Sequence, residues 1–217
     1  MAKNITTLLF DFDGTLLNTN DLIIQSFQHV LNKYFPGEYD RNDILPFLGP
    51  TLHETFGSVN LEKSEEMIKD YREWNIGMHD ELSTEFDGVT KTLHLLKEQG
   101  LKMAIVSTKQ NAVVMKGLNL LNVTDLFDVV IGLDDVQNPK PDPEPILLAL
   151  ERLGADKEES LMIGDNLHDI VGGQNAGVRT AGVAWSLKGE EFLQSFNPDY
   201  MLHHISDLLR IVKGEKI

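Results

Sequence analysis

Residues 8–15 read Leu-Leu-Phe-Asp-Phe-Asp-Gly-Thr, an apolar run that stops at two carboxylates and a glycine. A short unbroken apolar run near the start of a chain predicts a buried strand of a parallel sheet. Asp11 and Asp13 are two residues apart on this extended segment, so their side chains are expected to point to the same side. Gly14 lets the chain turn away at once, and Thr15 adds a hydroxyl beside the two acids.

The position of these acids favours a chemical role. In an open parallel α/β sheet, ligands bind just past the carboxyl ends of the strands. Two carboxylates aimed into one site share a proton or bind a cation. The alternative is a strand end closed by an Asx turn, for which Asp-x-Asp-Gly alone would suffice. The full string, with Thr15 and the preceding apolar run, is far more specific than that.

The bulk composition limits the classes of function. The chain has 217 residues, 41% of them hydrophobic, which is ample for the core of one or two domains. It has no cysteines, which excludes disulfides, thiolate zinc sites and cysteine nucleophiles and fits a cytoplasmic protein. No run approaches the roughly 18 apolar residues of a membrane span, so we expect no membrane partner. The net charge of -15 argues against nucleic acid and requires local positive charge wherever an anionic substrate binds.

The periodicity of apolar residues divides the chain into two parts. Residues 16–83 show helical periodicity with no strand signal, whereas from Gly88 onwards strands and helices alternate. Alternation of this kind predicts an α/β fold, a Rossmann-like parallel sheet with helices on both faces. We assign residues 1–15 and 84–217 to this core. The insertion 16–83 is expected to form a separate all-helical cap domain over the strand ends.

Two helix starts are predicted from their caps. Asn18 or Asn20 is expected to cap the first helix of the insertion. Asp142 is expected to cap a later helix, with Pro143 at its first position.

Further polar residues follow the predicted strands of the core. Ser107 comes directly after one strand, and Asp165 directly after another, with Asp169 four residues later. Lys140 lies between two prolines, which stiffen the backbone around it. Each has an ordinary alternative: a turn for Ser107, an exposed loop for Lys140, and the first turn of a helix for Asp169. Because parallel strands end at one edge of a sheet, Asp165 is expected to converge with Asp11.

These residues, in this order, resemble the four motifs of the haloacid dehalogenase superfamily of aspartate-based phosphotransferases. The resemblance covers the whole chain, and the helical insertion matches the C1 cap of that family. It implies that Asp11 attacks phosphorus and forms an aspartyl phosphate, and that Asp13 acts as general acid and base. It also implies that Ser107 and Lys140 stabilise charge on the phosphoryl oxygens. Asp13 further implies phosphate chemistry, because dehalogenases proper lack this second acid.

The resemblance also implies a metal ion and a phosphate-binding set. Four carboxylates with one lysine are unbalanced, and Mg²⁺ suits an all-oxygen site with few protein ligands. The implied metal-binding residues are Asp11, Asp13 through its backbone carbonyl, Asp165 and Asp169; Asp169 acts through a metal-bound water or by orienting Lys140. The additional phosphate-binding candidates are Gly14, Thr15, Thr108 and Lys109.

The substrate is expected to be a small phosphorylated molecule. Residues 18–20, 47–56, 71–79 and 166–169 together look like those of bacterial inorganic pyrophosphatases, especially 18–20, 49–51 and 166–169, which favours pyrophosphate. The loop 47–52 offers no Arg or Lys for a second anionic group on a larger substrate. Phosphoglycolate phosphatase is the nearest alternative and β-phosphoglucomutase a more distant one.

Two proteins of a different class would also carry acids of this kind. A receiver-type signalling domain clusters acids around Mg²⁺, but it lacks the helical insertion. A silent phosphate-binding protein would not need the complete set of motifs. His53, His79 and His168 could each be surface or packing residues, and His168 could instead contact a leaving phosphate. The sequence does not indicate an oligomeric state.

Overall fold

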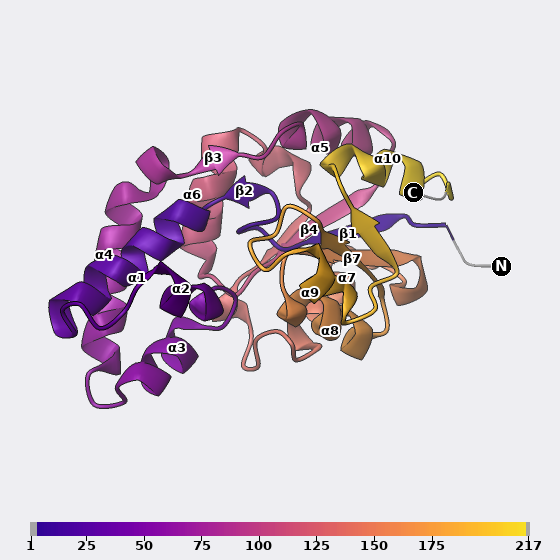
Figure 1. The fold of residues 1–217 in the computed structure, drawn as a ribbon. Helices are drawn as coiled ribbons and strands as arrows, with labels where there is room; N and C mark the ends of the chain where they lie inside the picture. Colours follow the sequence, from indigo (N-terminus) through magenta and orange to yellow (C-terminus); the bar gives the residue numbers. More distant parts are fainter. Residues whose placement is uncertain (1–3, 216–217) are drawn as a thin grey trace. The chain divides into compact units, whose positions relative to one another are not determined.

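The computed structural model describes residues 4–215 and divides the chain into two compact units. One unit contains the residues up to Leu17 and those from Glu85 onwards, and the other contains Asn18–Thr84. The first unit is a core with a parallel sheet and the second is a bundle of helices (Figure 1).

The core unit is built on one six-stranded sheet in which every pairing is parallel. Its strands are β1 (Thr7–Phe10), β4 (Lys102–Val106), β5 (Val129–Ile131), β6 (Ser160–Gly164), β7 (Arg179–Val183) and β8 (Tyr200–Leu202), in the spatial order β5-β4-β1-β6-β7-β8. Phe10 at the end of β1 is in register with Ile105 of β4 and Ile163 of β6. The three central strands therefore end within one residue of the same level, directly before the polar residues identified in the sequence.

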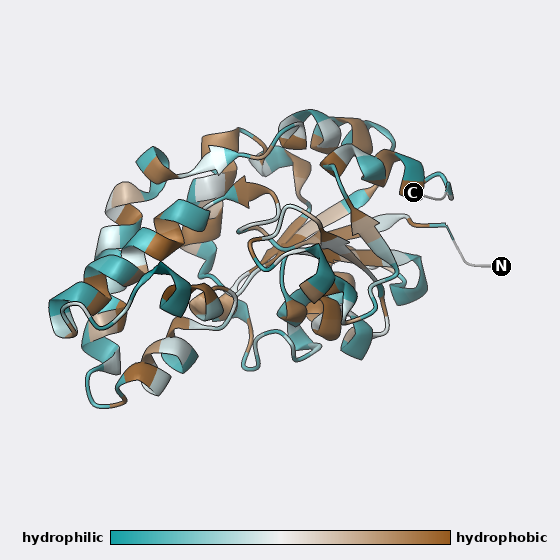
Figure 2. Cartoon of the chain, viewed as in Figure 1, coloured by the Kyte–Doolittle hydropathy of each residue, from teal (hydrophilic) through white to brown (hydrophobic). Residues whose placement is uncertain are grey.

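Helices cover both faces of this sheet, which confirms the predicted α/β fold. Alternate residues of β1 point to opposite faces, so Leu8 and Phe10 join one core cluster and Leu9 joins another. The first cluster includes side chains of α5 (Val89–Glu98), α6 (Asn111–Leu121) and α10 (Leu208–Ile211). The second cluster includes side chains of α7 (Glu144–Leu153). Two further helices, α8 (Leu167–Ala176) and α9 (Glu190–Gln194), lie on the same side of the sheet as α7 (Figure 1). Hydrophobic residues accordingly concentrate in the strands, while the outward helix faces are hydrophilic (Figure 2).

The helical unit has an aromatic core of its own. It contains α1 (Asn20–Tyr34), α2 (Arg41–Ile44), α3 (Leu52–Val59) and α4 (Ser64–Leu82). The ring of Phe27 on α1 packs against Phe47, Phe56 and Tyr71, with centroid separations of 5.5, 5.3 and 4.8 Å. A buried hydrogen bond of 2.9 Å from Asn75 Nδ2 to Ser26 Oγ also ties α4 to α1. The unit thus has the packing expected of an independent helical domain.

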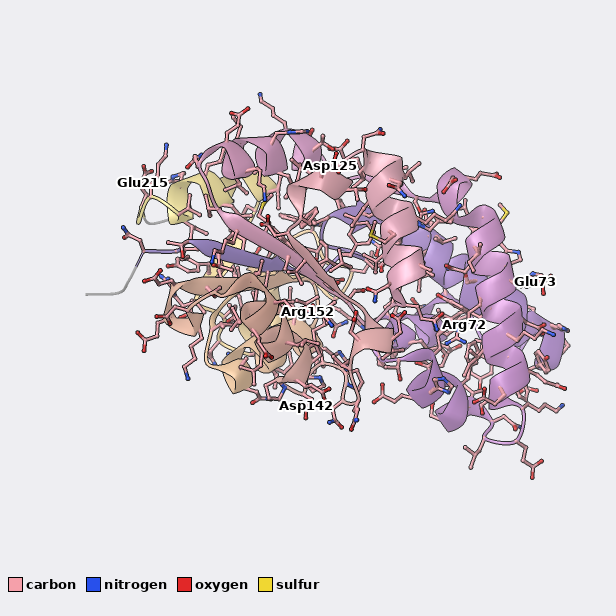
Figure 3. All side chains as sticks on the ribbon, turned by 180° about the vertical axis from the view of Figure 1, so that it is seen from behind. Arg72, Glu73, Asp125, Asp142, Arg152 and Glu215 are labelled. Carbon is pink, nitrogen blue, oxygen red and sulfur yellow. The ribbon has the colours of Figure 1, made fainter. Side chains whose placement is uncertain are left out.

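Many charged side chains lie on the outer surface of each unit. Arg72 and Glu73 on α4 and Arg152 on α7 are examples of such surface residues (Figure 3). Arg152 Nη2 donates to Asp135 Oδ1 at 3.1 Å, an exposed pair of the kind that contributes little to stability. No helix among the described residues combines the length and apolar character that a membrane crossing needs.

Three details of secondary structure correct the sequence-based predictions. The stretch 16–83 is not wholly helical, because β2 (Leu17–Asn18) pairs with β3 (Thr84–Glu85) in a small two-stranded sheet. Thr19, not Asn18 or Asn20, is the N-cap of α1; Asn20 is the first helical residue and Asn18 Oδ1 accepts a hydrogen bond of 3.3 Å from its backbone N–H.

The start of α7 also differs from the prediction. The helix begins at Glu144, so Pro143 is its N-cap and not its first residue. Asp142 Oδ1 nevertheless accepts a hydrogen bond of 2.9 Å from the backbone N–H of Glu144. Asp142 therefore satisfies a free N–H group of the first turn although it lies one residue before the N-cap and is not the N-cap itself.

Two adjacent glycines of α8 give a stability prediction with an internal control. A Cβ at Gly173 would lie 2.5 Å from Thr180 Cγ2, whereas the nearest atom to a Cβ at Gly172 is 3.5 Å away. We expect Gly173→Ala to lower the free energy of unfolding by about 1–3 kcal/mol through overpacking. Gly172→Ala should leave it unchanged or raise it by up to about 1 kcal/mol through helix propensity. Urea unfolding of both variants measures this, and a destabilisation of equal size in the two would contradict the packing described for α8.

Candidate active site

The polar residues that follow β1, β4 and β6 converge at one edge of the core sheet. The backbone N–H of Asp11 donates to Ile163 O at 2.8 Å, and that of Ser107 donates to Ile131 O at 2.9 Å. Hydrogen bonding between neighbouring strands therefore continues past the last residue of each strand. It fixes where the side chains of Asp11 and Ser107 leave the sheet, and Asp165 leaves it directly after β6.

Lys140 is buried at the centre of this edge. Its Nζ donates to Asp11 Oδ1 at 2.9 Å, to Asp169 Oδ1 at 2.6 Å and to the backbone oxygen of Val106 at 2.6 Å. An ammonium group has three donors, so all of them are used. Burial alone would lower the pKa of Lys140, but Asp11 and Asp169 raise it above its usual value and keep the side chain charged. The alternative of an exposed loop lysine is therefore wrong.

Three carboxylates surround the same point. One oxygen from each of Asp11, Asp165 and Asp169 lies within 4.8 Å of the others. Burial raises the pKa of Asp11 from 3.8 to about 7; Lys140 lowers it, and Asp169 and Asp13 raise it further. Burial also raises the pKa of Asp165 well above its usual value, with added repulsion from Asp11 and Asp169. The cluster has more negative charge than Lys140 balances, and its all-oxygen donors suit a hard divalent cation.

Two glycines make room for these carboxylates. A Cβ on Gly14 would lie 2.8 Å from Asp165 Cγ and closer still to one of its oxygens, and Gly14 has a φ of +76° that other residues rarely adopt. A Cβ on Gly164 would overlap the side chain of Asp169. Asp165 can approach the turn after β1 only because Gly14 has no side chain.

Lys109 lies in the loop that follows Ser107. Its Nζ donates to Asp13 Oδ1 at 2.6 Å, with about one-sixth of each side chain exposed, and its backbone N–H donates to Ser107 Oγ at 3.1 Å. The sequence-based hypothesis assigned Lys109 to phosphate and did not anticipate the contact with Asp13. Thr108 between them is half-buried.

Thr15 is fully buried. Its backbone oxygen accepts a hydrogen bond of 3.3 Å from the indole N–H of Trp185, and its Oγ1 has no hydrogen-bond partner within residues 4–215. Gly14 and Thr15 thus belong to the turn that directly follows Asp13.

The loop after β7 is a part of this site that was not predicted from the sequence. Ser186 Oγ donates to the backbone oxygen of Asp165 at 2.6 Å and accepts from the backbone N–H of Lys188 at 3.1 Å. A signal was present, because Trp185, Ser186 and Lys188 follow a predicted strand just as Ser107 and Asp165 do. Their relevance depends on β7 lying beside β6, which is a fact of the sheet order.

Comparison with known proteins identifies the family. The model of the haloacid dehalogenase-like hydrolase family matches residues 8–183, which include every motif named above. The chain belongs to the haloacid dehalogenase-like hydrolases. This confirms the resemblance inferred from the motifs and makes the chain an enzyme of hydrolase type.

Named relatives within this family are similar over nearly the whole chain. The chain is 53% identical to a protein of Bacillus velezensis named pyrophosphatase PpaX, over 96% of this chain and 97% of that one. It is 55% identical to a protein of the same name from Bacillus cereus, over 97% of each chain. A crystal structure described as a haloacid dehalogenase-like hydrolase from Bacteroides fragilis has a TM-score of 0.88 and 31% identity, covering 94% of this chain and 99% of that one.

The three histidines left open by the sequence have ordinary surroundings in this hydrolase. His79 is buried in α4 with Nδ1 2.7 Å from Asp80 Oδ1, and His53 Nδ1 lies 3.3 Å from Glu65 Oε1 in the same unit. His168 Nδ1 lies 3.1 Å from Asn166 Oδ1. Each of these three contacts lies within the histidine's own unit or turn.

The raised pKa of Asp11 predicts how the stability of the metal-free hydrolase depends on pH. A carboxyl group whose pKa is about 7 in the folded protein and 3.8 when unfolded favours folding at low pH, and that contribution is lost as the pH rises through 7. We expect the free energy of unfolding in EDTA, relative to Asp11→Asn, to fall between about pH 4 and about pH 7 and to level off above that. A saturating divalent metal should remove this fall, because it binds the ionised carboxylate. A difference that is constant with pH in EDTA would contradict the assigned environment of Asp11.

Proposed function

We propose that this hydrolase is an inorganic pyrophosphatase that converts diphosphate and water to two phosphates through a phosphorylated Asp11. The observation that carries the proposal is the pinning of Asp11 Oδ1 by buried Lys140 at the end of the central strand. This contact leaves Oδ2 as the oxygen that can attack a substrate. The pyrophosphatase name of its close relatives supports diphosphate as the substrate.

The reaction proceeds in two displacements on phosphorus. Asp11 Oδ2 attacks one phosphorus atom, the bond from that phosphorus to the bridging oxygen breaks, and the first phosphate leaves with the electron pair. Water then attacks the phosphorus of the aspartyl phosphate and gives up a proton to Asp13 as its oxygen bonds to phosphorus. The bond to Asp11 breaks, the second phosphate leaves as Asp13 passes the proton to it, and both carboxylates are restored.

The other residues at this edge of the sheet stabilise negative charge and orient the reacting groups during these steps. Ser107 Oγ accepts from the backbone N–H of Lys109, so its own proton remains to be donated to a phosphoryl oxygen. Lys140 acts through the fixed position of its charge, because its donors are committed to Asp11, Asp169 and Val106. Lys109 is a candidate to contact the substrate with the donors that Asp13 does not use.

We further propose Mg²⁺ as the cofactor. Asp11 and Asp165 would hold it with the backbone carbonyl of Asp13, and Asp169 would bind one of its waters. Bound there, Mg²⁺ neutralises negative charge on the phosphoryl oxygens. The three convergent carboxylates and the raised pKa values of Asp11 and Asp165 support this assignment.

The helical unit Asn18–Thr84 acts in this proposal as the cap that selects the substrate. The chain leaves the core after Leu17 and returns at Glu85, so the unit has two linkers to the core that could serve as hinges. Its loop 47–52 carries no basic residue, which supports a compact substrate over one with a distant second anionic group. The absence of cysteine and the charge of -15 support a cytoplasmic protein without a nucleic-acid partner.

A substrate panel tests the proposed function. We expect kcat/KM for pyrophosphate to exceed that for phosphoglycolate and glucose 6-phosphate by at least about tenfold, a difference of about 1.4 kcal/mol in transition-state binding. EDTA should abolish all turnover, and Asp11→Asn should abolish it without unfolding the protein. A preference of about tenfold for phosphoglycolate would favour the alternative, a phosphoglycolate phosphatase. Turnover that survives Asp11→Asn would remove the aspartyl-phosphate mechanism.

A further inference from the structure

The loop 184–188 is attached to both turns that carry the catalytic carboxylates. The indole N–H of Trp185 donates to the backbone oxygen of Thr15 at 3.3 Å, beside the turn of Asp13. Ser186 Oγ donates to the backbone oxygen of Asp165 at 2.6 Å. The loop is thereby held against the site from two sides, and none of the proposed steps uses it.

Ser186 also fixes the position of Lys188. The same hydroxyl oxygen that donates to Asp165 accepts a hydrogen bond of 3.1 Å from the backbone N–H of Lys188. One hydroxyl group therefore separates the backbone of Lys188 from that of Asp165. The side chain of Lys188 is half-buried, and the charge of Asp165 acts on it.

The charges of the site leave a need for another cation. When all four are ionised, Asp11, Asp13, Asp165 and Asp169 contribute four negative charges, and Lys109 and Lys140 contribute two positive ones. A divalent metal would bring these groups to neutrality, so the charge of diphosphate itself remains to be matched. A buried anion without a partner is costly, and Lys140 has no donor left to offer it.

The electrostatic environment of Lys188 agrees with a role in binding an anion. Burial lowers the pKa of Lys188, and Asp165 opposes that shift, so the ammonium group is partly desolvated and within the electrostatic reach of the metal-binding carboxylate. When a metal neutralises Asp165, the ammonium group loses part of this compensation. A phosphate group placed beside it would restore the compensation.

We propose that Lys188 binds the second phosphate group of diphosphate, the one that leaves when Asp11 attacks. The proposal rests on the proposed function and makes the loop 184–188 a specificity element of the core unit. A phosphomonoester of an uncharged alcohol has no second phosphate and gains nothing from Lys188. The competing explanation is that Lys188 only offsets the charge of Asp165, in which case every substrate depends on it equally.

The test compares two substrates on matched variants of the full chain. Lys188→Met removes the charge but keeps the length of the side chain, Lys188→Arg keeps the charge, and Lys213→Ala removes an exposed lysine near the end of α10 as a control. We expect Lys188→Met to lower kcat/KM for pyrophosphate about tenfold or more, the usual effect of losing a charged hydrogen bond. Its kcat/KM for p-nitrophenyl phosphate should change by less than about threefold. Lys188→Arg should recover most of the loss, and Lys213→Ala should resemble the wild type.

The outcomes separate this inference from the proposed function. The first requirement is that Lys188→Met unfolds at the same temperature as the wild type. If this variant then loses activity equally on both substrates, or loses none on either, the role of Lys188 is overturned. The proposed function stands in that case as long as the wild type hydrolyses pyrophosphate. If Lys188→Met unfolds, the same comparison on Lys188→Gln decides. A wild-type protein that hydrolyses p-nitrophenyl phosphate but not pyrophosphate would overturn the proposed function and this inference with it.

Discussion

The buried ammonium of Lys140 is the interaction on which the site depends. A charge of this kind is tolerated inside a protein only when its partners are fixed in place, and loss of one partner is strongly destabilising. Its three hydrogen bonds join the end of β4 at Val106, the acid after β1 and the acid on α8. Three elements from distant parts of the chain therefore take one arrangement, and Asp11 is left with one defined oxygen for chemistry.

The register of the central strands and two glycines bring the acidic residues of the site together. Because β4, β1 and β6 end within one residue of the same level, polar residues placed after them meet without any long loop. Gly14 and Gly164 then allow Asp165 and Asp169 to approach closer than any Cβ would permit. Burial of these carboxylates, with added repulsion between them, raises the pKa values of Asp11 and Asp165. Without metal the like charges repel one another, and under the proposed function a divalent cation would turn the same cluster into a binding site.

The sequence predicted the parts of this arrangement that follow from pattern alone. Apolar strands give the sheet, parallel strands share an edge, and Asp11 and Asp165 could therefore be placed together before the structure was known. The contact of Lys109 with Asp13 could not be predicted, because it depends on how the loop after Ser107 folds back. Lys188 was missed for a related reason: its position depends on the order of β6 and β7 and on one hydroxyl group of Ser186.

The central claim is that Asp11 itself carries the phosphoryl group. Borohydride reduces an acyl phosphate to an alcohol, so it converts a phosphorylated aspartate to homoserine and leaves a free aspartate unchanged. The protein is quenched during turnover of pyrophosphate with Mg²⁺, reduced and mapped by peptide mass spectrometry. We predict homoserine at position 11 and nowhere else, and none when pyrophosphate is omitted. Homoserine at another aspartate, with Asp11 unmodified, would contradict the account.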